Sequence, residues 1–526
     1  MIRSQKIGEF ISRNYISIII LVLFLLYFFL LHANSFNSPW ERDEGEYAYS
    51  AWLMEQGQTP YLQSFIQKPP LIIYTYYLAH LIEPLALWPP RLLSFLFTLA
   101  SCVLLGLMAK RLYGAPGGWL ALWISPLLLT SPFICALAAN TEKFMLLPLI
   151  GLLALFVFRR GQETKWTYFW AGILAALAVL YKPIALLPAI LLIIYWLASN
   201  WWMKKQAREL FFALAVVVLG VVSVTLLSVI YFIINGALGE LWQQVIVYNF
   251  NYAADMKSYF PSQFFRYLQI FWNNWWIIFL IIITSLIFRP KLFGLWWSLL
   301  LVSLLSIIST PMGHYYLLIM PFLILLAAGA YVQLASLLRI KELEWRNTLL
   351  VAVIIIIISI SFCSIYEQFF LSPRGLSIWI YGQEDPFVES ELMADKIRQN
   401  TQIGDGIFVG GSESQLYYFS QREAVSKFNI TYPLLIDTPW RTAYQQQAIN
   451  DIEQNKPVAI ILSQGRTSGL WEETEYFFAD YLLDKLKNDY YLVGATALTV
   501  QGEPIWLEAD NISDQAYSNL LLYLRK

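Results

Sequence analysis

The chain has 526 residues, of which 58% are hydrophobic, 17% aromatic and 13% charged, and its formal net charge is −1. This composition excludes a soluble globular protein, and the near-neutral charge excludes the basic face that nucleic-acid binding requires. The length exceeds that of a usual single domain, so a polytopic membrane protein with more than one domain is predicted.

Eleven apolar runs are predicted to cross the membrane as helices, because each approaches the length needed to span the hydrocarbon core. The first run follows a basic N-terminal segment; it is longer than a signal-peptide core and no small-residue cleavage pattern follows it, so a retained anchor is predicted. The predicted spans are 15–33, 91–109, 118–138, 144–159, 166–181, 184–199, 210–234, 273–288, 293–309, 315–337 and 347–366.

An acidic segment, Arg42-Asp43-Glu44-Gly45-Glu46-Tyr47-Ala48, follows the first span. Three carboxylates within four positions are costly beside a bilayer unless they face a water-filled cavity or pathway. A solvated surface loop is the alternative interpretation. The segment is therefore a candidate site for chemistry at the membrane surface.

Two aromatic-rich stretches are predicted to lie at the membrane interface. Residues 71–87 follow Gln67-Lys68-Pro69-Pro70 and are predicted to form a helix in the interface rather than a span. Residues 235–272 are rich in Tyr, Phe, Asn and Trp and are predicted to cover a cavity or hold a lipid at headgroup depth.

The composition becomes mixed and polar near Leu371. Residues 1–370 are predicted to form the transmembrane domain and residues 371–526 a soluble domain with its own core. Strand-like runs at 406–409 and 458–462 alternate with helix-like runs at 390–400 and 476–487, which favours an α/β fold. Its predicted role is acceptor contact or structural capping.

Cations in alternate loops predict the orientation, because Lys and Arg favour cytoplasmic loops. The N-terminus is predicted to lie inside, and the acidic segment and the C-terminal domain outside. The predicted inside cations are Arg3, Lys6, Arg13, Lys110, Arg111, Arg159, Arg160, Lys165, Lys204, Lys205, Arg208, Arg289, Lys291, Arg339, Lys341 and Arg346. The predicted outside cations are Arg42, Lys68, Arg91, Lys143, Lys182, Lys257 and Arg266.

This orientation places Glu142, Lys143, Lys182 and His314 at the outer ends of spans. ATP is absent there, so a transfer reaction requires a substrate that is already activated, such as a sugar on a polyprenyl phosphate. Lys68, Lys182 and His314 are the candidate partners for its phosphate. Asp43 is the candidate general base for an acceptor hydroxyl. Glu142, with Asp43 or Glu44, is a candidate ligand set for a divalent cation, and no nucleotide is expected.

Five motifs in chain order resemble the integral-membrane glycosyltransferases of the GT-C fold, in the bacterial branch that contains aminoarabinose transferases and protein O-mannosyltransferases. They are Asp43-Glu44-Gly45-Glu46-Tyr47, Gln67-Lys68-Pro69-Pro70-Leu71, Asn140-Thr141-Glu142, Tyr181-Lys182-Pro183 and His314 to Pro321. The similarity departs from the family pattern at two positions, since Gln67 stands where aminoarabinose transferases usually have Glu, and Glu142 where Asp is common.

The resemblance implies sugar transfer from a polyprenyl-phosphate monosaccharide, with inversion, to a lipid, polysaccharide or protein of the cell envelope, such as lipopolysaccharide. The enzyme would lie in the bacterial inner or plasma membrane, among its lipids, with an extracytoplasmic active site. Asp43 and Glu44 are the predicted catalytic residues. The predicted binders of the lipid phosphate or sugar are Lys68, Lys182, His314, Tyr47 and Tyr315, and a divalent cation is predicted at Asp43 and Glu142.

Several alternatives stay open at this stage. Lys68 and Lys182 could each snorkel to the interface instead. His314 could have a structural role, and Glu142 and Lys143 could form a neutralised pair within a loop. A transporter or flippase of lipid-linked sugars would also need cations for phosphate. Such proteins often contain two halves with matching interrupted spans, and no such symmetry is visible in the sequence.

Overall fold

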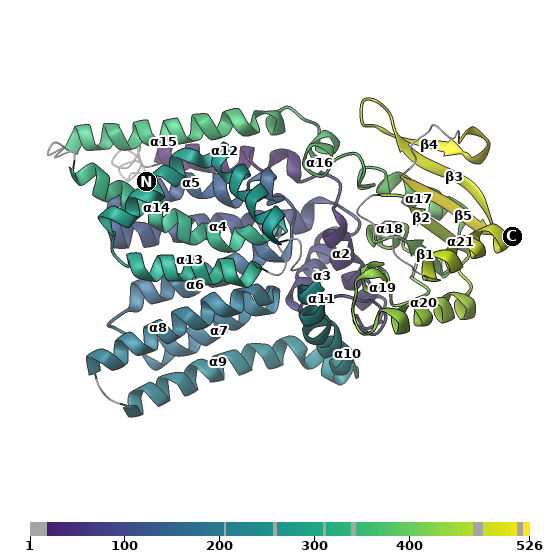
Figure 1. The fold of residues 1–526 in the computed structure, drawn as a ribbon, viewed down its shortest axis with the longest axis horizontal. Coiled ribbons are helices and arrows are strands. Elements are labelled where there is room, and N and C mark those ends of the chain that lie inside the picture. The colour runs from purple at the N-terminus through teal and green to yellow at the C-terminus, as the bar shows by residue number, and fades with distance from the viewer. Residues whose placement is uncertain are drawn as a thin grey trace, which may run out of the picture.

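A computed structural model describes residues 18–204, 207–255, 260–308, 312–337, 343–465, 477–512 and 519–526. A bundle of long helices occupies one side of the molecule and a five-stranded sheet the other (Figure 1). Seven cations used above to predict the orientation, Arg3, Lys6, Arg13, Lys205, Lys257, Arg339 and Lys341, lie outside the described residues.

Eight helices in the described residues are long and apolar enough to cross a membrane. They cover Ile18–Ser35, Trp88–Tyr113 (α4), Thr141–Arg159 (α6), Pro183–Trp201 (with α8, Leu186–Lys204), Ala207–Ile234 (α9), Ser262–Phe288 (within α12, Phe260–Phe288), Gly313–Ser336 (with α14, Met320–Leu337) and Thr348–Phe369 (with α15, Leu343–Ile365). An integral membrane protein with several spans is thereby confirmed.

Three of the eleven predicted spans correspond to shorter apolar helices. These are α5 (Ala115–Leu129), α7 (Lys165–Tyr181) and α13 (Phe293–Ile307), with 15, 17 and 15 residues. Such lengths fall at or below the usual minimum for a span. The complete set of eleven crossings therefore stays a prediction.

Close packing between α7 and α9 depends on two glycines. A Cβ atom at Gly172 would lie 2.0 Å from the Val217 carbonyl oxygen, and one at Gly220 would lie 2.3 Å from the Phe169 carbonyl oxygen. Lipid tails are as apolar as the helix surface, so membrane helices associate largely through close van der Waals packing, which small residues allow. Larger side chains at either position would push the two helices apart.

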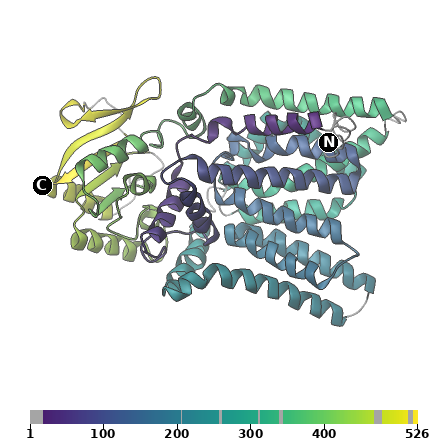
Figure 2. The ribbon, with the colours of Figure 1, turned by 180° about the vertical axis from the view of Figure 1, so that it is seen from behind.

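Several short elements lie between the bundle and the sheet. They are α2 (Arg42–Glu55), α3 (Leu71–Ile82), α10 (Leu238–Trp242), a π-helical turn at Gln243–Tyr248 and α11 (Asn249–Asp255). Both views of the ribbon place α2 and α3 at the end of the bundle that faces the sheet (Figures 1 and 2). The 12 residues of α3 are too few to span a membrane, as the sequence predicts.

The C-terminal region contains one mixed sheet in the order β1-β2-β5-β3-β4. The strands are β1 (Ile407–Gly410), β2 (Ala459–Ser463), β3 (Tyr490–Leu498), β4 (Pro504–Glu508) and β5 (Leu520–Arg525). β1 and β2 are parallel, whereas β5 pairs antiparallel with β2 and β3, and β3 with β4. The α/β expectation is thus confirmed as a small mixed sheet with helices.

The helices of this region are α16 (Pro373–Tyr381), α17 (Ser390–Asn400), α18 (Gln415–Ser420), α19 (Tyr432–Leu435), α20 (Arg441–Asn455) and α21 (Phe477–Asp489). β1 and β2 are buried along their whole length, which is typical of parallel strands covered on both faces. α18 packs directly on α2.

One hydrophobic cluster runs from the membrane helices into this region. It includes Phe144 and Leu326 of the bundle and Met393, Ile407 and Leu522 of the C-terminal region. The predicted division into residues 1–370 and 371–526 falls between a short 3-10 helix that ends at Phe369 and α16. Because the apolar packing is continuous across it, this division stays a prediction.

Candidate functional site

Two carboxylate–lysine pairs lie at the end of the bundle nearest the sheet. Lys68 Nζ is 3.7 Å from Asp43 Oδ2, and Lys182 Nζ is 2.9 Å from Glu142 Oε1. His314 Nε2 lies 3.8 Å from the same Glu142 oxygen. The five predicted residues come from five separate segments of the chain, and the structure brings them into these two groups.

The two groups act on each other electrostatically. Burial alone raises the pKa of the Asp43 carboxyl, but the charges of Lys68, His314 and Lys182 together with the Tyr47 hydrogen bond outweigh burial and lower the pKa to about 2. Asp43 is therefore ionised at neutral pH. Its side chain is also 22% exposed, which makes it the most accessible of the four side chains in the two pairs.

Asp43 is held in place by the first turn of α2. Glu41 caps this helix, because its side chain accepts from the Glu44 backbone N–H while the Glu44 side chain accepts from the Glu41 N–H. The Tyr47 hydroxyl, one turn further along, donates to Asp43 Oδ2 at 3.3 Å. Tyr47 is buried, so we assign it the positioning of Asp43 rather than direct substrate binding.

Glu44 points away from this cluster and is tied to Arg91 at the start of α4. Arg91 Nε donates to Glu44 Oε1 at 2.6 Å, and Arg91 Nη2 donates to Oε2 at 2.5 Å. The Ala139 N–H also donates to Glu44 Oε1 at 2.8 Å. Glu44 is fully buried with both oxygens bonded, so we assign it a structural role in place of the predicted catalytic one.

Lys68 is fixed by the loop that carries it. The Tyr61 hydroxyl donates to the Lys68 carbonyl at 2.8 Å, and Asn249 Nδ2 donates to the neighbouring Gln67 carbonyl at 2.7 Å. Burial lowers the pKa of Lys68, but Asp43 and Glu46 more than compensate, so the amine keeps its charge. With only 6% exposure Lys68 does not snorkel toward the interface, and that alternative is wrong.

Residues 244–249, within the predicted segment 235–272, contact this loop, whereas residues 256–259 of that segment lie outside the described residues. Gln244, in the π-helical turn, accepts from the Ile66 N–H at 3.0 Å and donates to the Tyr61 carbonyl at 2.7 Å. π-Helical turns often occur at functional sites because they redirect side chains. This segment therefore covers and orders the loop that presents Lys68.

Lys182 lies in the break between α7 and a short 3-10 helix at Pro183–Ala185. Its Nζ sits 4.3 Å from the centroid of the Tyr315 ring, a cation–π contact that fixes the amine beside Glu142. Thr141 Oγ1 donates to Glu142 Oε2 at 3.0 Å. Tyr315 therefore orients a cation, and Lys182, at 5% exposure, is not a snorkelling residue either.

Lys143 does not pair with its neighbour Glu142. Its Nζ donates to the Leu129 carbonyl at 2.8 Å, whereas Glu142 faces Lys182. Consecutive residues on a helix point about 100° apart, so the two side chains leave α6 in different directions. The alternative of a neutralised loop pair is wrong.

Glu46 is a buried carboxylate beside the first pair. It is 2% exposed, and its Oε1 has no hydrogen-bond partner. Burial raises the pKa of Glu46 to about 7, although Lys68 opposes this rise and Asp43 adds to it. The Glu46 carboxyl therefore changes charge near neutral pH.

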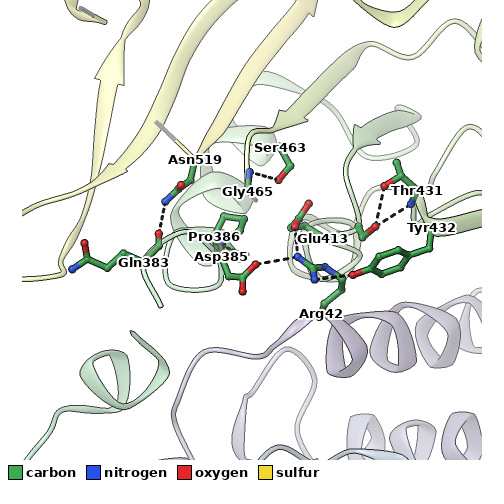
Figure 3. Close-up of polar contacts among 12 residues, drawn as sticks. Arg42, Gln383, Asp385, Pro386, Glu413, Thr431, Tyr432, Ser463, Gly465 and Asn519 are labelled. Carbon is green, nitrogen blue, oxygen red and sulfur yellow. Dashed lines mark hydrogen bonds and ion pairs between the residues drawn. The ribbon is translucent and has the colours of Figure 1, made fainter. Parts of the chain in front are cut away.

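The C-terminal region contacts α2 next to Asp43. Arg42 Nη2 lies 3.3 Å from Asp385 Oδ1 and 3.2 Å from Glu413 Oε1, and Arg42 Nη1 donates to the Tyr432 hydroxyl at 3.0 Å (Figure 3). A Cβ at Gly45 would lie 2.6 Å from the Gln415 backbone nitrogen, so only glycine allows α18 to approach α2 this closely.

The predicted metal ligands Asp43 and Glu142 are each paired with a lysine. A divalent cation would have to displace or tolerate an ammonium group at both positions, which its charge disfavours. Among the described residues, no group of three or more His, Cys, Asp or Glu side chains is arranged to hold a metal ion. The residues therefore do not fit a metal site well, and metal binding stays a prediction.

Two important arginines were not recognised as part of the site from sequence. The sequence places both among the outside cations, whereas in the structure Arg91 binds Glu44 and Arg42 binds Asp385 and Glu413. Arg91 does carry a signal, because an isolated cation directly after Pro89-Pro90 at the start of an apolar run needs a buried partner.

Comparisons with known proteins agree with this architecture. Residues 67–228 match the sequence profile of the family described as dolichyl-phosphate-mannose-protein mannosyltransferase. No curated protein matches the chain. The crystal structure of ArnT from Cupriavidus metallidurans bound to undecaprenyl phosphate is similar over 96% of this chain and 100% of that chain, with a TM-score of 0.59 and 15% identity.

Two further solved structures show the same likeness. ArnT from Cupriavidus metallidurans in the apo state matches 96% of this chain and 97% of its own, with a TM-score of 0.59 and 14% identity. The Archaeoglobus fulgidus oligosaccharyltransferase tethered with an acceptor peptide matches 96% of this chain and 76% of its own, with a TM-score of 0.51 and 12% identity. The predicted GT-C fold is confirmed by these matches.

Proposed function

We propose that the protein is a glycosyltransferase of the GT-C type that transfers one monosaccharide from a polyprenyl-phosphate donor to a lipid, polysaccharide or protein acceptor at the outer face of the membrane, with inversion. The family match of residues 67–228 and the likeness to ArnT support this proposal. The observation that carries the proposal is the pairing of Asp43 with Lys68 beside Glu142 with Lys182 and His314.

The two lysines supply the charge that an anionic donor needs. Each is nearly buried and already desolvated, so an incoming phosphate gains more from it than from a hydrated surface amine. One ArnT structure contains undecaprenyl phosphate, and that relative shares the fold of this chain. This likeness supports a polyprenyl phosphate as the group that Lys68 and Lys182 bind.

Docking of the donor changes the basicity of Asp43. In the free site Lys68 and Lys182 hold the pKa of Asp43 at about 2, which makes it a poor proton acceptor. A phosphate that shares these cations cancels part of their effect and raises that pKa. Asp43 then becomes an effective base only when the donor is in place.

The transfer itself is a single displacement. The acceptor oxygen attacks the anomeric carbon on the face opposite the phosphate, the new carbon–oxygen bond forms, and the bond to the phosphate oxygen breaks. The electron pair of that bond leaves with the polyprenyl phosphate, whose added charge Lys68 and Lys182 stabilise. Asp43 accepts the proton of the acceptor hydroxyl. One displacement inverts the anomeric centre, and no step requires a metal ion.

The outer location rests on the distribution of charge. The loops predicted to lie inside carry most of the cations, and the catalytic cluster lies at the other end of α6, beside the C-terminal sheet region. The same distribution disfavours the flippase alternative, because a transporter site is usually placed near the midplane of the bilayer.

Mass spectrometry of lipids and envelope glycans from a deletion strain tests the proposal. We expect one polyprenyl-phosphate monosaccharide to accumulate and one glycan mass to disappear, with both reversed by the wild-type protein. Complementation by Asp43→Asn should fail. If the protein were a flippase, its deletion would instead leave the donor on the inner leaflet, and the purified protein would catalyse no transfer in detergent.

A further inference from the structure

A cavity of about 310 Å³ lies where α4 and α6 end and α13 begins. It is separate from the catalytic cluster. The residues that line it are Arg111, Leu112, Phe156, Val157, Arg160, Lys291 and Leu292.

The helix α6 fixes the distance between this cavity and the catalytic cluster. Glu142 lies in the first turn of α6 and Arg159 at its end, and 17 residues of helix at 1.5 Å each span about 26 Å. That distance is close to the thickness of the hydrocarbon core. The cavity therefore lies at the headgroup level of the leaflet opposite the catalytic cluster.

Three cations from three separate segments of the chain meet at the cavity. Arg111, Arg160 and Lys291 all line it, and no acidic residue does. Within the described part of the chain none of the three forms an ion pair with a carboxylate. No carboxylate of the described protein therefore neutralises these cations.

Neighbouring groups contact the Arg160 side chain and the backbone of Lys291. The Arg160 guanidinium lies 5.6 Å from the Phe156 ring centroid and 6.0 Å from that of Tyr195. The Tyr113 hydroxyl donates to the Lys291 carbonyl at 3.1 Å and accepts from Trp296 Nε1 at 2.9 Å. The ring contacts of Arg160 lower the conformational entropy that this side chain would lose on binding an anion.

The beginning of α13 adds a second attraction for anions. Leu292 is the N-cap of this 15-residue helix, and no side chain caps its first N–H groups. The positive end of the helix dipole therefore faces the region of the three cations. Leu112, Phe156 and Val157 give the cavity an apolar wall beside this charge.

General placement of cations at the inner face accounts for only part of this pattern. The positive-inside tendency and the negative helix ends of α4 and α6 explain Lys110 and Arg159 as well as their neighbours Arg111 and Arg160. Only Arg111 and Arg160 line the cavity. The convergence of three cations on one hollow with an apolar wall needs a further explanation.

We propose that this cavity is a binding site for the phosphate headgroup of an anionic phospholipid in the leaflet opposite the catalytic cluster. The cations and the start of α13 bind the phosphate, and the apolar wall packs against the glycerol and the first acyl carbons. Basic hollows between membrane helices are suited to such headgroups because the anionic leaflet supplies them at high local concentration. The proposal does not depend on the sugar-transfer reaction.

Native mass spectrometry of the purified full-length protein with phosphatidylglycerol or phosphatidylcholine tests this site. We expect saturable binding of phosphatidylglycerol and much weaker binding of phosphatidylcholine. The triple variant Arg111→Gln, Arg160→Gln, Lys291→Gln should lose binding by about fivefold for each cation removed. The matched control Lys110→Gln, Arg159→Gln removes neighbouring charges outside the cavity and should bind like the wild type.

Two readouts keep the result interpretable. Thermal stability in a neutral detergent should be alike for the triple variant and the control, which excludes misfolding as the cause of lost binding. The proposal is overturned if the triple variant binds phosphatidylglycerol like the control, or if both lipids bind equally. Competition by millimolar inorganic phosphate that abolishes lipid binding would also overturn it, in favour of a site for a soluble anion.

Discussion

Arg42 Nη2 lies 3.2 Å from Glu413 Oε1, so an ion pair joins the residue next to Asp43 to the loop between β1 and α18. The contact is nearly closed to solvent, with side-chain exposures of 11% and 0%. Asp385 and Tyr432 complete the ring around the guanidinium (Figure 3). The C-terminal region therefore determines where the first turn of α2 lies.

Glu413→Gln should lower kcat while the donor KM stays nearly constant. The weaker hold on Arg42 lets the first turn of α2 shift, and a displacement of about 1 Å of a reacting group can cost about a hundredfold in rate. The control Glu503→Gln removes a carboxylate from the exposed pair with Arg374 and should leave kcat unchanged. Equal effects of the two variants would mean that the C-terminal region does not position Asp43.

Lys68→Gln should raise the donor KM by about 10- to 100-fold, the range for losing a hydrogen bond to a charged group. Steady-state kinetics with varied donor measures it. Lys485→Gln is a suitable control, because Lys485 pairs with Glu453 of α20 and Asp489 of α21 in the C-terminal region. A donor KM equal to that of the control would contradict the assignment of Lys68 to the phosphate.

Glu44→Gln should lower the free energy of unfolding, and any loss of activity should follow from this lower stability. Removing one partner of a buried ion pair costs about 3 to 5 kcal/mol because the other charge remains uncompensated. The double variant Glu44→Leu, Arg91→Leu should lose less than the sum of the two single changes. Thermal unfolding in detergent measures this coupling. Unchanged stability with abolished transfer would restore the predicted catalytic role of Glu44.

Glu46 makes the stability of the protein depend on pH. Its pKa is raised from 4.5 to about 7, so the folded state holds a proton that the unfolded chain releases. Stability is full below pH 4.5 and falls as the pH rises toward 7, by an amount on the order of 3 kcal/mol. Glu46→Gln removes this loss. The melting temperature of the Glu46→Gln variant should exceed that of the wild type at pH 8 and approach it at pH 5. If the variant and the wild type differ in melting temperature by the same amount at both pH values, the pKa of Glu46 is not raised.

The sequence predicts most of the membrane architecture because apolar runs carry a direct physical signal. Within the described residues each of the eleven predicted runs overlaps a helix, but three of these helices are short and the run at 118–138 continues past the end of α5 at Leu129. The charged residues at the outer ends of spans also stand out, since few charges are tolerated near hydrocarbon. This signal predicts Glu142, Lys143, Lys182 and His314, whereas Asp43 is predicted from the acidic segment and Lys68 from the motif that contains it.

Partner choice among these charges could not be predicted from the sequence. Glu142 and Lys143 are neighbours in the chain, yet helix geometry directs them to Lys182 and to the Leu129 carbonyl. Glu44 and Arg91 are far apart in sequence, and only tertiary packing brings them together. The insertion of β5 between β2 and β3 is likewise a long-range pairing that local patterns do not encode.

Gly45 illustrates the same limit within a recognised motif. The sequence places it between two carboxylates and gives no reason for a glycine inside a helix, where it is unfavourable. The reason lies in α18, whose Gln415 backbone occupies the space that a Cβ would need. The acidic segment thus encodes both the reactive carboxylate and the contact that positions it.

The most direct test of the central claim is the rate of sugar transfer by purified Asp43→Asn protein in lipid vesicles that contain the polyprenyl-phosphate donor. The change removes the base but keeps the shape of the side chain. We predict a rate at least about a hundredfold below that of the wild type, with donor binding and thermal stability retained. A rate close to that of the wild type would contradict the assignment of Asp43 as the base and the account of the site built on it.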